Sequence, residues 1–138
     1  MLILLRDQVT PASFYGDLWG VPAKGLAPVP ALSTLLLLRK AAACGKETNV
    51  FEGRNLIGFV QEGDDEHADS GIAAVLTNGS AGKKHLCLGR RHACELFRDA
   101  LLACSEPETG TGNLPVRGGS VSVYVSEKLY RWILLAGC

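Results

Sequence analysis

The residues with the most obvious chemistry form an acidic cluster in one short segment. Asp64, Asp65, Glu66, His67 and Asp69 fall together between two apolar runs. Carboxylate oxygens in this number are the ligands that Ca²⁺ prefers. The spacing does not follow an EF-hand loop, which needs a glycine at its sixth position. We therefore interpret the cluster as a solvated hairpin loop and predict no metal ligands in it.

A second segment, "GKKHLCLGRRHA" (Gly82–Ala93), gathers four basic residues and two histidines. Such a segment could attract anions. The whole chain of 138 residues, however, balances 14 Lys and Arg against 14 Asp and Glu, so it has no long-range field for polyanions. We expect a solvated basic face and neither nucleic acid nor a membrane as a partner.

The cysteines and histidines do not form a recognisable site. Five cysteines are an odd number without CxxC spacing, and we expect them to be mostly reduced. His92 and Cys94 would point the same way on a strand, but two ligands do not make a metal site. A Ser-His-Asp arrangement with His92 and Asp99 lacks the GxSxG motif that would mark its nucleophile.

The N-terminal third contains the helical elements. Residues 1–8 resemble the end of a helix, Pro11 breaks it, and "ASFYG" up to residue 16 predicts a short buried strand. A loop rich in Gly and Pro follows. Residues 30–44 then predict a helix that is apolar on nearly all sides, which is typical of a helix packed between other elements.

After Gly45 the pattern changes to short apolar runs separated by turn residues. This pattern is typical of an antiparallel sandwich or barrel, with the boundary near residues 46–52. Strands are predicted at residues 55–61, 71–77, 85–89, 94–99 and 119–125.

In the last predicted strand, valines alternate with polar residues. Val121, Val123 and Val125 share one face, and Ser122 and Tyr124 share the other. We expect a half-buried strand with its valines in the core and its serines in solvent.

Three stretches carry a family resemblance: "RDQVTPASFYGDLWGVP" (Arg6–Pro22), "NLIGFVQEGDDEHADSGIAAVLTNGSAGKKHLCLGRRHA" (Asn55–Ala93) and "VRGGSVSVYV" (Val116–Val125). In this order they resemble the C-terminal part of α-amylases of glycoside hydrolase family 13, of the liquefying bacterial type and its intracellular and fungal relatives. The resemblance implies a mainly β fold. Residues 47–125 would form a Greek-key antiparallel β-sandwich, the amylase domain C. Residues 1–46 would be a remnant of the (β/α)₈ TIM barrel with its last strand and last helix, and residues 126–138 a C-terminal tail.

The resemblance also implies a function. The family hydrolyses internal α-1,4 bonds of starch and glycogen with carboxylates at the ends of earlier barrel strands, so we predict that this chain has no catalytic residues and is inactive alone. Tyr15 and Trp19 would line a sugar-binding cleft or pack the loop after the strand, and Asp17 would tie that loop down. The alternatives are a non-catalytic α-glucan-binding module and a truncated gene product without a function of its own.

Calcium is the cofactor that the resemblance brings into question. In the family a His-Asp pair entering domain C often binds it, and the matching positions here are Thr48 and Asn49. We predict no cofactor. The segment 103–116 is shorter than its counterpart, which predicts a strand that is shortened or missing.

Three expectations concern the ends of the chain and its location. The tail, "LYRWILLAGC", is apolar enough either to dock on the helix at residues 30–44 or to remain disordered. Without a barrel to cover it, that helix would otherwise promote self-association. "MLILLRDQ" is too short an apolar run for a signal peptide, so we expect a cytoplasmic location, although many family members are secreted.

Overall fold

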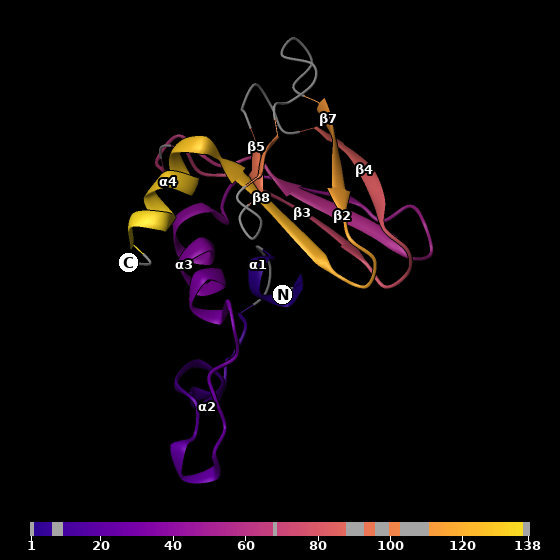
Figure 1. Cartoon of the computed structure of the whole chain (residues 1–138). Helices are drawn as coiled ribbons and strands as arrows, with labels where there is room; N and C mark the ends of the chain where they lie inside the picture. Colours follow the sequence, from indigo (N-terminus) through magenta and orange to yellow (C-terminus); the bar gives the residue numbers. More distant parts are fainter. Residues whose placement is uncertain are drawn as a thin grey trace.

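Antiparallel β-strands dominate the computed structural model, which describes residues 2–6, 10–67, 69–87, 93–95, 100–102 and 111–136 (Figure 1). Within these ranges the strands are β1 (Glu47–Val50), β2 (Leu56–Gln61), β3 (Ile72–Thr77), β4 (Gly82–Cys87), β5 (Ala93–Glu95), β6 (Ala100–Leu102), β7 (Thr111–Val116) and β8 (Val121–Ser126).

The strands form two sheets. The larger has the order β1-β2-β3-β8-β5-β6, and the smaller pairs β4 with β7. β8 returns beside β3 after the chain has passed through the second sheet, which is a Greek-key connection. The predicted fold class, an antiparallel β-sandwich in a mainly β chain, is confirmed.

Helices cover the outer face of the larger sheet. α1 (Leu2–Leu5), α3 (Leu32–Ala42) and α4 (Glu127–Ala136) lie against it, whereas α2 (Tyr15–Trp19) and the 3₁₀ helix η1 (Pro22–Lys24) lie at the far end of a projecting segment (Figure 1). None of the helices in the described ranges has both the length and the apolar character that crossing a membrane would require.

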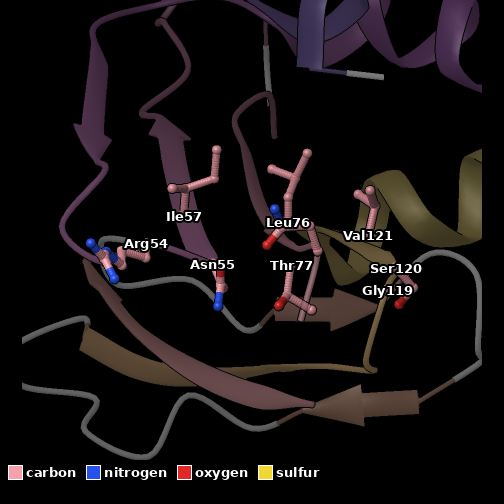
Figure 2. Close-up of a pocket in the computed structure, with 9 residues that line it drawn as sticks. Arg54, Asn55, Ile57, Leu76, Thr77, Gly119, Ser120 and Val121 are labelled. Carbon is pink, nitrogen blue, oxygen red and sulfur yellow. The ribbon is translucent and has the colours of Figure 1, made fainter. Parts of the chain in front are cut away.

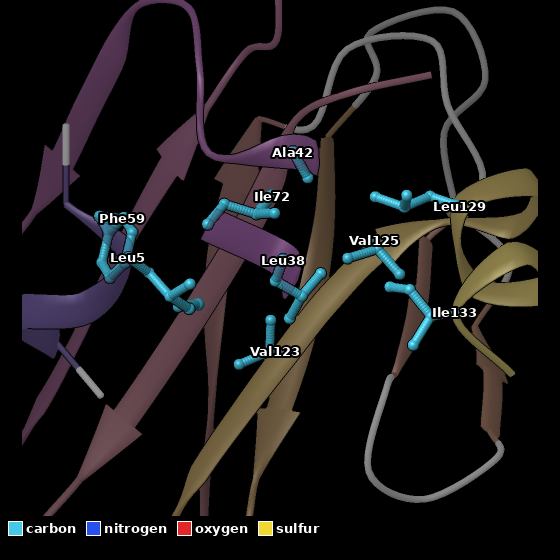
Figure 3. Packing of buried hydrophobic residues seen from close by; sticks show 10 residues of the cluster. Leu5, Leu38, Ala42, Phe59, Ile72, Val123, Val125, Leu129 and Ile133 are labelled. Carbon is cyan, nitrogen blue, oxygen red and sulfur yellow. The ribbon is translucent and has the colours of Figure 1, made fainter. Parts of the chain in front are cut away.

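Two hydrophobic clusters lie on opposite faces of the larger sheet. The sandwich cluster joins Val75 and Tyr124 of that sheet to Leu86, Leu114 and Val116 of the smaller one. The helix-side cluster, on the other face, contains Leu5, Leu38, Ala42, Phe59, Ile72, Ala74, Val123, Val125, Leu129 and Ile133 (Figure 3). The molecule therefore has three layers: the small sheet, the large sheet and the helices.

β8 differs from its prediction as a half-buried strand. Val123 and Val125 are buried as predicted, but they face the helices, while Ser122 and Tyr124 are also buried and Tyr124 faces the smaller sheet. The Tyr124 hydroxyl donates a hydrogen bond to the backbone oxygen of Pro115. Because this hydroxyl has a partner, Tyr124 can be buried, and β8 has no solvent face along its centre.

The predicted strand at residues 11–16 is wrong. These residues have no strand structure, and α2 begins at Tyr15, which is 73% exposed beside a 69% exposed Phe14. A strand is stable only where neighbouring strands satisfy its backbone groups. No described strand lies beside this segment, so its short apolar run does not form one.

The predicted helix is confirmed as α3, slightly shorter than expected. Its last turn carries Arg39 and Lys40, and it buries Leu32, Leu38 and Ala42. The helix packs on the large sheet rather than remaining bare, so the self-association surface that we expected on this helix is largely covered.

The tail residues Glu127–Ala136 form α4, whose main contacts are with β8 and β5 of the large sheet and not with α3, on which docking was hypothesised. Leu129 and Ile133 of α4 enter the same helix-side cluster as Leu38 and Ala42 of α3. Ser126 starts the helix, because its Oγ accepts the N–H of Leu129 at 3.3 Å and donates to the backbone oxygen of Asp69 at 2.9 Å.

The sequence patterns missed β1, β6 and β7. β7 forms in the segment where a strand was expected to be shortened or missing, and it pairs with β4 over six residues. Pro115 is tolerated there because the sheet described around it has only two strands. β1 has exposed residues at Thr48 and Asn49 and therefore no long apolar run.

We expect the docked face of α4 to stabilise the whole fold. Leu129→Ala combined with Ile133→Ala should lower the free energy of unfolding by about 4 kcal/mol or more, because each deletion of a buried large side chain costs about 2–5 kcal/mol. Chemical denaturation measures the loss.

The matched control is on the same helix. Leu134 and Leu135 are 50% and 77% exposed, so changing both to Ala should alter the free energy of unfolding by only about 0.5 kcal/mol each. Equal losses from the two double variants would contradict the docking of α4.

Candidate functional site

Two aromatic rings stand side by side on α2. Tyr15 and Trp19 are four residues apart and therefore share one helix face. Their ring centroids are 6.3 Å apart with the planes tilted by 42°. The side chains are 73% and 62% exposed, so both rings are available to a ligand in the described structure.

The segment that carries these rings is held together by backbone hydrogen bonds. Val21 and Leu26 exchange N–H···O bonds of 2.8 and 3.2 Å. The Val29 N–H donates to the backbone oxygen of Asp17 at 2.7 Å. This bond holds the loop through the main chain of Asp17 and does not use the carboxylate to which the sequence analysis assigned the role. We call residues 10–30 the aromatic arm.

The aromatic arm exposes an unusual amount of apolar surface. Phe14, Tyr15, Trp19, Leu26 and Val29 are 49–73% exposed. Contiguous exposed apolar surface commonly marks a binding or interaction site. Both alternatives for Tyr15 and Trp19, lining a sugar-binding cleft and packing the loop, stay predictions.

A polar junction connects the N-terminal helices to the sheet. Arg39 donates to the backbone oxygens of Leu4 and Arg6 at 2.7 and 2.8 Å. Arg6 forms an ion pair of 2.7 Å with Glu47. The buried Gln61 donates through Nε2 to the Leu5 oxygen at 2.9 Å. These bonds place α1 and α3 on the sheet.

The acidic cluster forms a loop between β2 and β3, as predicted, with Asp65, Glu66 and His67 exposed. Asp64 Oδ1 accepts the backbone N–H of His67 at 2.8 Å and lies 2.7 Å from the ring Nδ1. The side-chain hydrogen bond with His67, aided by one with Cys44, holds the pKa of Asp64 below its ordinary value.

The structure brings Cys44 into this loop. Its Sγ, a carboxylate oxygen of Asp64 and a ring nitrogen of His67 lie within 4.8 Å of one another. The sequence analysis did not pair Cys44 with the loop, because a long-range contact creates the proximity. The only local signal was a glycine beside each partner. Gly45 follows Cys44, and Gly63 precedes Asp64.

Those two glycines explain the contact. Gly45 and Gly63 have φ of 80° and 77°, and a Cβ on Gly45 would overlap the backbone of Gly63. The Gly63 N–H donates to the Cys44 oxygen at 3.1 Å. The close approach of the two backbones therefore requires glycine.

A pocket of about 300 Å³ opens at one end of the helix-covered sheet face (Figure 2). Its apolar floor is Ile57, Leu76 and Val121, which are paired across three adjacent strands. Arg54 and Asn55 lie at its edge. The floor continues the face that buries Phe59 and Val123, and Leu76 and Val121 pack against the helix-side cluster.

Calcium does not fit the positions that the resemblance assigned to it. Thr48 and Asn49 lie exposed on β1 and offer a hydroxyl and an amide but no carboxylate.

The sequence analysis also singled out a basic segment and the cysteines. Lys83 and His85 of the basic segment are exposed on β4, in agreement with a solvated face. Cys44 and Cys87 are free thiols. His92, Asp99, Cys104 and Cys138 lie outside the described residues.

The fold and the arm define a β-sandwich domain with a helical layer and an exposed aromatic segment. The chain is 37% identical over 133 residues to an α-amylase of Bacillus licheniformis, covering 91% of this chain and 26% of that protein. It is 35% identical to a glucan 1,4-alpha-maltohexaosidase of Bacillus sp. (strain 707), over 91% of this chain and 25% of the relative. No family model matches the chain.

A cytoplasmic α-amylase of Escherichia coli (strain K12) is 33% identical, over 93% of this chain and 28% of its own length. This chain therefore spans about a quarter of the length of the curated relatives that it matches. The chain is related to the α-amylases, and the prediction that it is a C-terminal part of such an enzyme is confirmed.

The glycine contact yields a stability prediction. Gly45→Ala should lower the free energy of unfolding by more than the roughly 1–2 kcal/mol that a left-handed backbone costs a residue with a Cβ, because the new methyl also meets Gly63. Gly25→Ala is the control: its φ is 66°, yet no atom lies within 4 Å of the added Cβ. Thermal or chemical unfolding compares the two, and equal effects would contradict the close approach.

Proposed function

We propose that this chain binds α-glucan through the aromatic arm without hydrolysing it. The observation that carries the proposal is the pair of exposed rings, Tyr15 and Trp19, on one face of α2. Aromatic side chains offer a large flat apolar surface together with a polar group, which suits stacking against a sugar ring.

The comparisons support the ligand class. The names of the relatives describe α-amylases and a maltohexaosidase that acts on glucan. A retaining glycosidase needs two carboxyl groups about 5–5.5 Å apart. In the family these groups belong to barrel strands that precede the matched part, so binding and hydrolysis would be separate properties of the complete enzyme.

Affinity electrophoresis in native gels with and without soluble starch tests the proposal. We expect starch to retard the full chain. Tyr15→Ala and Trp19→Ala should each raise the Kd at least about fivefold, because losing a ring at the centre of a contact costs more than about 1 kcal/mol.

Trp132→Ala provides the control, because Trp132 is 47% exposed on α4 and lies outside the aromatic arm. Retardation that survives both arm variants but fails in Trp132→Ala would move glucan binding to the tail. Release of reducing sugar by the wild-type chain would show that it is catalytic and would overturn the non-catalytic part of the proposal.

Self-association is the second candidate, and the exposed apolar residues of the arm favour it. Because α3 is largely covered, the surface in question is now the aromatic arm. If the aromatic arm mediates self-association, the wild-type chain should form a concentration-dependent oligomer, and the double variant Trp19→Ser with Leu26→Ser should be a monomer. Size-exclusion chromatography with light scattering measures both. A wild-type chain that stays monomeric at high concentration would exclude this candidate.

A further inference from the structure

We propose that Cys44, Asp64 and His67 form a binding site for Zn²⁺ that joins the end of α3 to the β2–β3 loop. The site lies outside the aromatic arm and is independent of glucan binding. It uses a thiol, a carboxylate and an imidazole, three groups that commonly coordinate zinc.

The distances suit a single ion. Zn–S bonds are about 2.3 Å and Zn–N and Zn–O bonds about 2.0–2.2 Å, so ligands around one tetrahedral ion are about 3.3–3.6 Å apart. The three ligand atoms here lie within 4.8 Å of one another. Asp64 Oδ1 and His67 Nδ1, now 2.7 Å apart in a hydrogen bond, would separate slightly to admit the ion.

The backbone around the ligands is already ordered. Cys44 is held beside the loop by the hydrogen bond from Gly63, and the Gly71 N–H donates to the Ala42 oxygen at 3.0 Å. The Asp64 N–H donates to Ser70 Oγ at 3.1 Å, and the His67 N–H donates to Asp64 Oδ1. Little rearrangement would be needed when the ion binds, which reduces the cost of binding.

The ligand types select the metal. Thiolate and imidazole ligands favour Zn²⁺ and its transition-metal neighbours, whereas Ca²⁺ and Mg²⁺ require oxygen ligands in larger number. The His67 side chain is 51% exposed, so solvent reaches the site and water can supply the fourth ligand. The proposed site thus differs in chemistry from a calcium site.

The site would have a structural role. Cys44 follows α3, which belongs to the helical layer, while Asp64 and His67 belong to the large sheet's hairpin. A metal bound to both would cross-link the two layers. Because zinc binds the assembled ligands more tightly than the separated ones of the unfolded chain, it would raise the melting temperature.

The test is a titration of the reduced, chelator-treated full chain with ZnCl₂ by isothermal titration calorimetry and with CoCl₂ by absorption spectroscopy. We expect one tight site, a thiolate-to-cobalt charge-transfer band and a higher melting temperature with Zn²⁺. Cys44→Ser should remove the band, and His67→Ala or Asp64→Asn should weaken Zn²⁺ binding by at least the roughly 10- to 100-fold that loss of an outer-shell partner costs.

Cys87→Ser and His85→Ala are matched controls, since both residues are exposed on β4 and far from the loop in sequence. They should leave binding unchanged. Failure of the wild-type chain to bind Zn²⁺, or Zn²⁺ affinity that survives all three ligand variants, would overturn the proposal. If Cys44→Ser proved unstable, the exposed His67→Ala variant would decide the question by the same titration.

Discussion

The three central strands of the large sheet carry buried side chains on both faces, and the arrangement of the other elements follows from the need to cover both. One face is covered by β4 and β7, which gives the sandwich cluster. The other face is covered by helices, because Phe59, Ala74 and Val123 align across β2, β3 and β8 and together form an apolar stripe. A sheet of this kind cannot be stable as a two-layer sandwich alone, since the stripe would face water.

The helical layer is fixed by polar contacts as well as by burial. Apolar contacts do not define one orientation, whereas the bonds from Arg39 and Gln61 to backbone oxygens near α1 have fixed directions. Ser126 orients α4 in the same way. Its hydroxyl caps the start of α4 and donates a hydrogen bond to the backbone oxygen of Asp69 in the loop before β3. The polar junction therefore orients the helices, and the helix-side cluster stabilises them.

Local patterns predicted the elements with strong local signals. The runs at Leu56–Gln61 and Ile72–Thr77 are bounded by turn residues, and both form strands there. The alternation in Val121–Val125 predicted a strand but not its surroundings, because alternation shows that two faces differ and does not show what covers each. Only the fold places helices over the valines and a second sheet over Tyr124. Likewise, "ASFYG" has the composition of a strand, yet strand pairing depends on neighbours that the local sequence does not contain. Of the candidate site, Tyr15 and Trp19 were identified from their types, whereas Cys44 reaches Asp64 only through the packing of Gly45 on Gly63.

The helix-side layer is assembled from segments on both sides of the strands in the sequence. Leu5 and Leu38 precede every described strand, and Leu129 and Ile133 follow them all. During synthesis from the N-terminus, the stripe on β2 and β3 is therefore translated well before α4, the last part of its cover. Until α4 emerges, the nascent chain exposes apolar sheet surface. Such surface promotes aggregation, and chaperones bind it. Coverage of the stripe is thus a late event in the synthesis of these residues, and the segment is most vulnerable to misassembly just before α4 is available.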